Sequence, residues 1–196
     1  MNNLVTFRPR TVWLSAGVTA VIVLSLVVQT IASGGIKADL IAIAWGTFIL
    51  SGAYLLFVRP KVEVFDEGIT ITNPLQKITV GWQRVETIEA RYTMSIQVGG
   101  KIIYAWAAPA PGRYHSRTVH STDIKGMDIG FEGQIRAGES PRSQSGQASY
   151  IAKLRLKEFE ASGVKGCESS LEINYIGAAI LIGSLVVALA FYAFNF

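Results

Sequence analysis

Three long uncharged runs constrain this chain more than any other feature. They occupy residues 12–31, 40–58 and 173–194 of the 196-residue sequence. A helix needs roughly 20 residues to cross a hydrocarbon core of about 30 Å. Lipid cannot hydrogen-bond the backbone, whereas a helix satisfies its own N–H and C=O groups. The sequence therefore predicts three transmembrane helices.

The first run has an alternative interpretation as a cleavable signal peptide. Arg8 and Arg10 form a basic lead, and Thr30-Ile31-Ala32 loosely resembles a cleavage site. The apolar core of a signal peptide has about 7–15 residues, however. The longer run favours a retained span. Composition agrees with a membrane protein, because 50% of the residues are hydrophobic and only 16% are charged.

Charges beside the first two runs predict the orientation, because an excess of Lys and Arg stays in the cytoplasm. Four basic residues lie just before the first run or just after the second: Arg8, Arg10, Arg59 and Lys61. The loop between the runs, residues 32–39, holds one Lys and one Asp. We therefore expect a multi-pass plasma-membrane protein whose tail, residues 1–11, and central segment are cytoplasmic. The third span then carries the carboxyl terminus outward.

The predicted spans contain no Asp, Glu, Lys, Arg or His. Ion pathways and proton relays usually need such groups inside the membrane, which argues against a transporter. Small residues four apart, Ala42 with Gly46 and Ala179 with Gly183, favour close helix approach. An oligomer formed through the spans is one consequence of that pattern.

After Pro60 the hydrophobic period changes to two, which predicts β-strands. The first hairpin consists of Val62 and Val64, then Ile69 and Ile71, around Asp66-Glu67-Gly68. We expect Gly68 to take a positive φ in that turn. Further strands are predicted at 78–80, 85–92, 95–98 and 101–106, with turns at Asn73-Pro74 and Gly99-Gly100. A seventh strand lies near 118–119 or at 127–131.

A helix is predicted from Ser149 to Ala161, ended by Gly163. The Ser-rich segment 138–146 before it is predicted to be a mobile loop, and residues 162–172 a linker to the third span. Trp82 and Trp106 are predicted to be core aromatics, because a small domain gains much buried area from each.

Several short motifs follow the two leading runs in a fixed order: Arg59-Pro60-Lys61-Val62, Asp66-Glu67-Gly68-Ile69, Asn73-Pro74-Leu75, and Trp82 followed by Val85. Over residues 59–111 the chain resembles the bacterial PH domains of actinobacterial membrane proteins, the type named after the low molecular weight protein antigen six. The resemblance implies a non-catalytic, membrane-tethered module and no particular ligand. The expected fold is three membrane helices plus an α+β, β-rich PH-like barrel with a C-terminal helix over residues 60–161.

Histidines in the later part of the domain suggest a metal site only weakly. The spacing of His115, His120 and Asp123 matches no standard ligand motif. Solvated loop histidines are the favoured interpretation, and we predict no metal or other cofactor. No catalytic triad, phosphate-binding glycine loop or carboxylate pair is recognisable in the sequence either, so we expect a protein that is not an enzyme.

Basic residues offer candidate contacts to lipid headgroups or a protein partner. The candidates are Arg113, Arg117, Lys153 and Lys157. Lys153, Arg155 and Lys157 are predicted to form one basic helix face. The segment 59–172 is nearly neutral overall, which argues against nucleic acid as a partner. We predict an adaptor or scaffold that binds proteins at the membrane. The alternative is an accessory subunit of a larger envelope or transport complex that acts through its spans.

Overall fold

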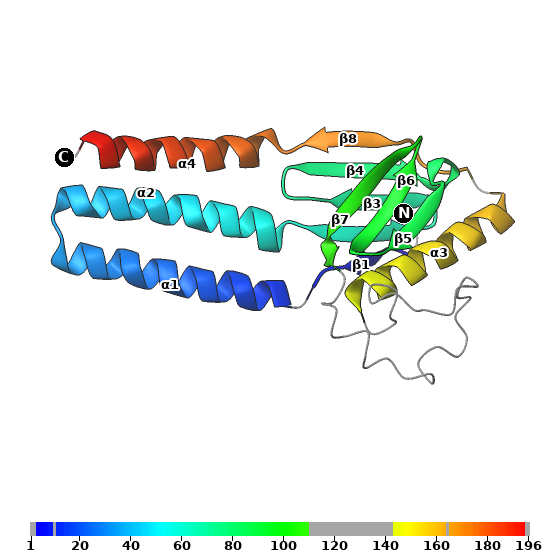
Figure 1. The fold of residues 1–196 in the computed structure, drawn as a ribbon, viewed down its shortest axis with the longest axis horizontal. Helices are drawn as coiled ribbons and strands as arrows, with labels where there is room; N and C mark the ends of the chain where they lie inside the picture. The colour runs from blue at the N-terminus through cyan, green and yellow to red at the C-terminus, as the bar shows by residue number, and fades with distance from the viewer. Residues whose placement is uncertain (1–2, 10, 110–142, 164, 195–196) are drawn as a thin grey trace. The chain divides into compact units, whose positions relative to one another are not determined.

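The structure is a computed structural model that describes residues 3–9, 11–109, 143–163 and 165–194. It forms two compact units (Figure 1). One unit contains the long apolar helices α1, α2 and α4. The other contains the β-strands and helix α3.

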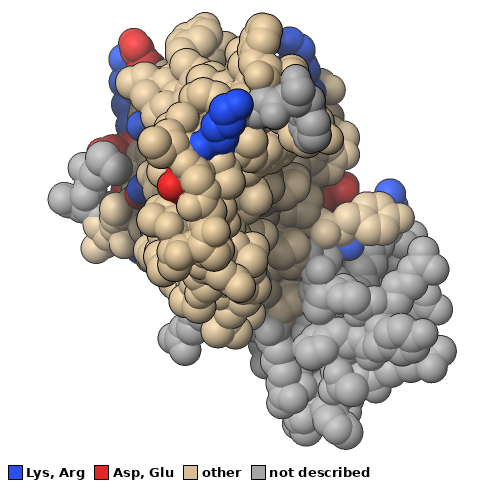
Figure 2. All heavy atoms as spheres, turned by 90° about the vertical axis from the view of Figure 1, so that its left-hand side faces the viewer, with Lys and Arg blue, Asp and Glu red and all other residues tan. Residues whose placement is uncertain are grey.

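The three predicted apolar helices are confirmed. They are α1 (Thr11–Ser33), α2 (Ile36–Ala53), which continues as a π-helical turn from Tyr54 to Val58, and α4 (Tyr175–Phe194). Their mean hydropathies are 2.2, 2.0 and 2.3, so each is long and apolar enough to cross a membrane. Figure 2 shows a largely uncharged surface where these helices face the viewer.

The predicted loop 32–39 is wrong in extent, because α1 reaches Ser33 and α2 already begins at Ile36. The prediction ended each span where charges begin. A helix continues past that point, because Asp39 in the first turn of α2 interacts favourably with the helix dipole. The long stem of Lys37 also lets its ammonium group reach water.

Glycines act differently at the two predicted small-residue sites. A Cβ on Gly46 would lie 3.0 Å from Val27 Cγ2 and 3.3 Å from Val23 Cγ1, so Gly46 lets α1 and α2 approach closely. A Cβ on Gly183 would meet nothing within 4 Å. Gly46 therefore serves packing within the helical unit, whereas Gly183 faces open space.

A five-stranded antiparallel sheet forms the larger β layer, in the order β1-β2-β3-β4-β8. Its central strands are β2 (Lys61–Phe65), β3 (Gly68–Thr72) and β4 (Gln76–Gly81). The edges are β1 (Val5–Phe7) and β8 (Ser170–Ile173). Strand β1 lies in the predicted tail, and β8 covers the end of the predicted linker and the first residue of the predicted third span. The prediction gave neither strand. Val5 pairs with Val64 and Phe7 with Val62, so the tail completes the sheet.

A second sheet contains β5 (Thr87–Ala90), β6 (Thr93–Val98) and β7 (Lys101–Pro109) in that order, after a 3-10 turn η2 (Trp82–Arg84). Gly99 and Gly100 join β6 to β7 with φ of +55° and +73°, as the glycine pair predicts. All six predicted strands are thus present, but in two sheets instead of one meander. Both candidates for a seventh strand, 118–119 and 127–131, lie outside the described residues.

Helix α3 (Gln144–Ser162) begins five residues before the predicted start. Ser143 caps it, because its Oγ accepts a hydrogen bond from the Gly146 N–H at 2.8 Å. Gly163 ends it with a φ of +63°. The predicted loop 138–146 is therefore wrong from residue 144 onward. The helix buries a face of small side chains against the domain: Ser145, Gly146, Ala148, Ser149 and Ala152.

The core lies between the two sheets and α3. Its members come from all three: Val62, Val64, Ile69, Ile71, Val80, Trp82, Ile88, Met94, Ile96, Ala105, Ala107, Ala108, Ala148 and Ala152. Trp82 is buried as predicted, and its Nε1 donates a hydrogen bond to the Phe65 carbonyl at 2.9 Å. The prediction for Trp106 was wrong, because that residue is 57% exposed.

The role of Gly68 also differs from the prediction. Positive φ among the described glycines occurs at Gly99, Gly100 and Gly163, and Gly68 instead lies in β3 opposite Phe65 and Gly81. A Cβ at this position would lie 2.5 Å from the Val80 oxygen and 2.6 Å from Cys167 Sγ. Glycine is required here because the neighbouring backbone comes so close.

We expect Gly68→Ala to lower the free energy of unfolding by about 1–3 kcal/mol, because the added methyl overpacks this contact. Denaturant unfolding of the full chain in mild detergent, followed by tryptophan fluorescence, measures the change. Gly17→Ala in α1 is the matched control, since a Cβ there meets nothing within 4 Å. Equal stability of Gly68→Ala and the wild type would contradict the close approach.

Candidate functional site

Strand β7 carries large apolar side chains on its outward face. Ile102, Tyr104 and Trp106 are 55%, 56% and 57% exposed. The alternate residues of the strand, Ala105 and Ala107 among them, face the core. We call Ile102, Tyr104 and Trp106 the aromatic stripe. It lies on the edge strand of the three-stranded sheet.

Asn73, the residue directly after β3, fixes the backbone of the stripe. Its Nδ2 donates to the Tyr104 carbonyl at 2.9 Å, and its Oδ1 accepts from the Trp106 N–H at 2.9 Å. The Asn73 side-chain amide thus makes the two hydrogen bonds to β7 that the backbone of a neighbouring strand would make. A surface that binds a partner benefits from such rigid support, because less freedom is lost on binding.

The sequence-predicted contact residues are only partly placed by the structure. Arg113 and Arg117 lie outside the described residues, as do His115, His120 and Asp123. Lys153 and Lys157 are exposed on α3, one turn apart. Arg155 was predicted to share this basic face of α3. It instead forms ion pairs with Asp66 at 3.2 Å and Glu158 at 2.8 Å.

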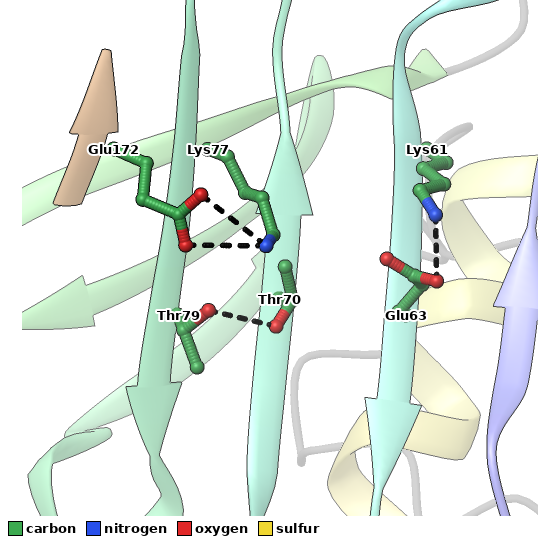
Figure 3. A network of polar contacts seen from close by, with 6 residues as sticks. All are labelled: Lys61, Glu63, Thr70, Lys77, Thr79 and Glu172. Atoms are coloured by element: carbon green, nitrogen blue, oxygen red, sulfur yellow. Dashed lines mark hydrogen bonds and ion pairs between the residues drawn. The ribbon is translucent and has the colours of Figure 1, made fainter. Parts of the chain in front are cut away.

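The outward face of the five-stranded sheet is polar and carries its own contacts (Figure 3). Lys61 Nζ lies 2.8 Å from Glu63 Oε1, and the hydroxyls of Thr70 and Thr79 are 3.0 Å apart. Lys77 Nζ lies 3.2 Å from Glu172 Oε1, which joins β4 to β8. Partly exposed ion pairs of this kind stabilise a fold only slightly.

In the helical unit, α2 and α4 border an apolar cavity of about 400 Å³. Leu40, Ala44, Ala179 and Gly183 are among its lining residues, together with Thr47 and Ser184. The Thr47 hydroxyl donates to the Ile43 carbonyl and the Ser184 hydroxyl to the Leu181 carbonyl. Because these hydroxyls bond within their own helices, the cavity suits a hydrocarbon or helix surface better than a polar ligand.

Reactive groups are sparse in the described ranges. No group of three His, Cys, Asp or Glu residues that would hold a metal ion occurs in them. The partly buried Cys167 donates its backbone N–H to the Glu67 carbonyl at 3.0 Å. Burial raises the pKa of its thiol above the usual value, a backbone hydrogen bond opposes this, and the Glu67 charge adds to the rise. The protonated thiol is a poor nucleophile at neutral pH.

No protein-family model matches this chain, and no curated protein or solved structure matches it either.

The raised pKa predicts slow alkylation of Cys167. At pH 8 the folded chain should react with iodoacetamide more slowly than the same chain in urea, as measured by intact mass. Because the folded state disfavours the thiolate, the free energy of unfolding should fall as the pH rises through the range in which the Cys167 thiol titrates. Alkylation at equal rates in the folded and unfolded states would contradict the burial effect.

Proposed function

We propose that this protein is a non-enzymatic, membrane-tethered adaptor of a bacterial plasma membrane, whose PH-like domain binds a protein partner on the cytoplasmic face. The observation that carries this proposal is the aromatic stripe on β7. Three large apolar side chains share one face of one strand, and each is more than half exposed.

The chemistry of the stripe supports a protein partner. Trp and Tyr are enriched among the residues that contribute most to protein–protein affinity, because they bury a large area and lose little side-chain entropy. Single exposed apolar residues are ordinary, whereas a contiguous group marks an interaction surface more often. The polar outward face of β5 and β6 would form a rim beside it, with Thr87 and Glu89 exposed.

The charges beside the spans support a cytoplasmic domain, and the strand pairing supports a tail and a domain on one side of the membrane. Basic residues flank the first two spans on the side of the domain, in agreement with the positive-inside rule. In addition, β1 precedes both spans and β2 follows them, yet the two strands pair in one sheet. Such pairing requires an even number of membrane crossings between the strands, which α1 and α2 supply.

The cavity between α2 and α4 favours a second candidate function, that of an accessory subunit of a membrane complex. The open space beside Gly183 would let a helix of another subunit approach closely. In that case the spans would make the essential contact and the domain would be secondary.

Site-specific photocrosslinking separates the two functions. With p-benzoylphenylalanine in place of Tyr104 in the full chain in cells, the adaptor function predicts a discrete protein adduct. Trp106→Ala should reduce this adduct at least tenfold, because the partner loses its neighbouring anchor. Gly183→Leu should leave it unchanged.

The matched control carries the crosslinker in place of Glu160, which is exposed on α3, outside the stripe and its rim. Equal adducts from both positions, or adducts with lipid alone, would contradict the adaptor function. Loss of the adduct in Gly183→Leu with the domain still folded would favour the accessory subunit.

The orientation has a separate test. In a Cys167→Ser background, Lys101→Cys places a thiol at the exposed start of β7, beside its turn with β6. A membrane-impermeant maleimide should label it only after the plasma membrane is permeabilised. Labelling in intact cells would place the domain outside.

A further inference from the structure

A row of three polar residues crosses the outward face of the five-stranded sheet. The strand register places Lys61 of β2 opposite Thr72 of β3, and Thr72 opposite Lys77 of β4. Residues directly opposite one another in antiparallel strands point to the same face. Their neighbours Val62 and Ile71 point into the core, so the row faces away from it.

The side chain of the middle residue has no hydrogen-bond partner among the described residues. Thr72 is only 5% exposed, and its Oγ1 bonds to no group in the part of the chain that the structure describes. The equivalent hydroxyls one step along the sheet, on Thr70 and Thr79, bond to each other. A buried hydroxyl without a partner is unfavourable, and a ligand that accepts its proton would remove that cost.

The flanking lysines retain the capacity to bind an anion. Lys61 and Lys77 each contact one carboxylate, from Glu63 and Glu172, and their side chains are 31% and 39% exposed. An ammonium group has three N–H donors, so a second acceptor can join each pair. Figure 3 shows the Lys77 side chain extending from β4 toward β3.

Chain connectivity holds one end of this row near lipid. Lys61 follows the last helical residue of the second span, Val58, by three positions. Three extended residues cover at most about 10 Å. The headgroup layer of each leaflet is about 5–8 Å thick. Once α2 is inserted, the Lys61 side chain therefore reaches the depth of the lipid phosphates.

We infer that Lys61, Thr72 and Lys77 bind the phosphodiester of an anionic membrane lipid. The two ammonium groups pair with the phosphate oxygens, and the Thr72 hydroxyl donates a hydrogen bond to one of them. Because Thr72 is only 5% exposed, the side chains that cover its hydroxyl move aside to admit the phosphate. This site depends on insertion of α2, and it is independent of the protein partner and of the aromatic stripe.

The test uses the full chain purified in mild detergent. Thermal unfolding is followed while dihexanoyl phosphatidylglycerol is added, with dihexanoyl phosphatidylcholine, glycerol 3-phosphate and inorganic phosphate as separate arms. We expect phosphatidylglycerol to raise the Tm most. Lys61→Gln and Lys77→Gln should each weaken its apparent affinity about fivefold, in keeping with the contribution of one basic residue at an anionic surface.

Thr72→Val supplies a readout that a purely structural threonine would not give. It should raise the Tm without lipid, because the unpaired hydroxyl is gone, and at the same time weaken phosphatidylglycerol binding. The matched controls are Thr87→Val and Lys101→Gln, both exposed and on the other sheet. They should bind phosphatidylglycerol as the wild type does.

Several results would overturn the inference. Unchanged affinity in Lys61→Gln, Lys77→Gln and Thr72→Val would exclude the row as the site. Equal weakening by Lys101→Gln would indicate general surface charge. An equal rise in Tm with inorganic phosphate would assign the row to a free anion instead of a lipid. No protein partner enters this assay, so its failure leaves the adaptor function standing.

Discussion

The inability of hydrocarbon to hydrogen-bond a peptide backbone governs the design of this chain. Three runs without charge can satisfy their N–H and C=O groups in lipid only as unbroken helices, and α1, α2 with its π-turn, and α4 are such helices. Little chain remains between these helices and the domain. Lys61 begins β2 three residues after Val58, and Glu172 of β8 lies three residues before Tyr175. The β domain is thus held by short connections at both ends.

Elements with a clear hydrophobic period were predictable from the sequence. The long helices and the strands β2 to β7 repeat their pattern over enough residues to be recognised. The edge strands β1 and β8 contain three and four residues, and alternation over so short a stretch does not stand out from chance. The start of helix α3 was predicted too far along the chain for a different reason. Its first turns bury serine, glycine and alanine, so the Ser143 cap was the available signal and apolar periodicity was not.

The exposure of the stripe on β7 could not be predicted from the sequence pattern alone. A period of two assigns residues to the two faces of a strand but does not say which face is buried. Side-chain size would suggest the wrong face. Tyr104 and Trp106 are larger than Ala105 and Ala107, yet the alanines face the core. The small face of α3 explains the reversal. Because Ala148 and Ala152 bring the helix close to the sheets, the space beneath β7 admits alanine and excludes an indole.

The pairing of β1 with β2 makes assembly of the domain depend on events at the membrane. Residues 5–7 leave the ribosome first, but their partner strand is made more than fifty residues later, after both helices of the hairpin. With α1 and α2 inserted as a hairpin, β1 and β2 must lie on the same side of the membrane before they can pair. A protein fused directly before Val5 would crowd the sheet edge, so a reporter fused at this end would disturb the fold that it was meant to observe.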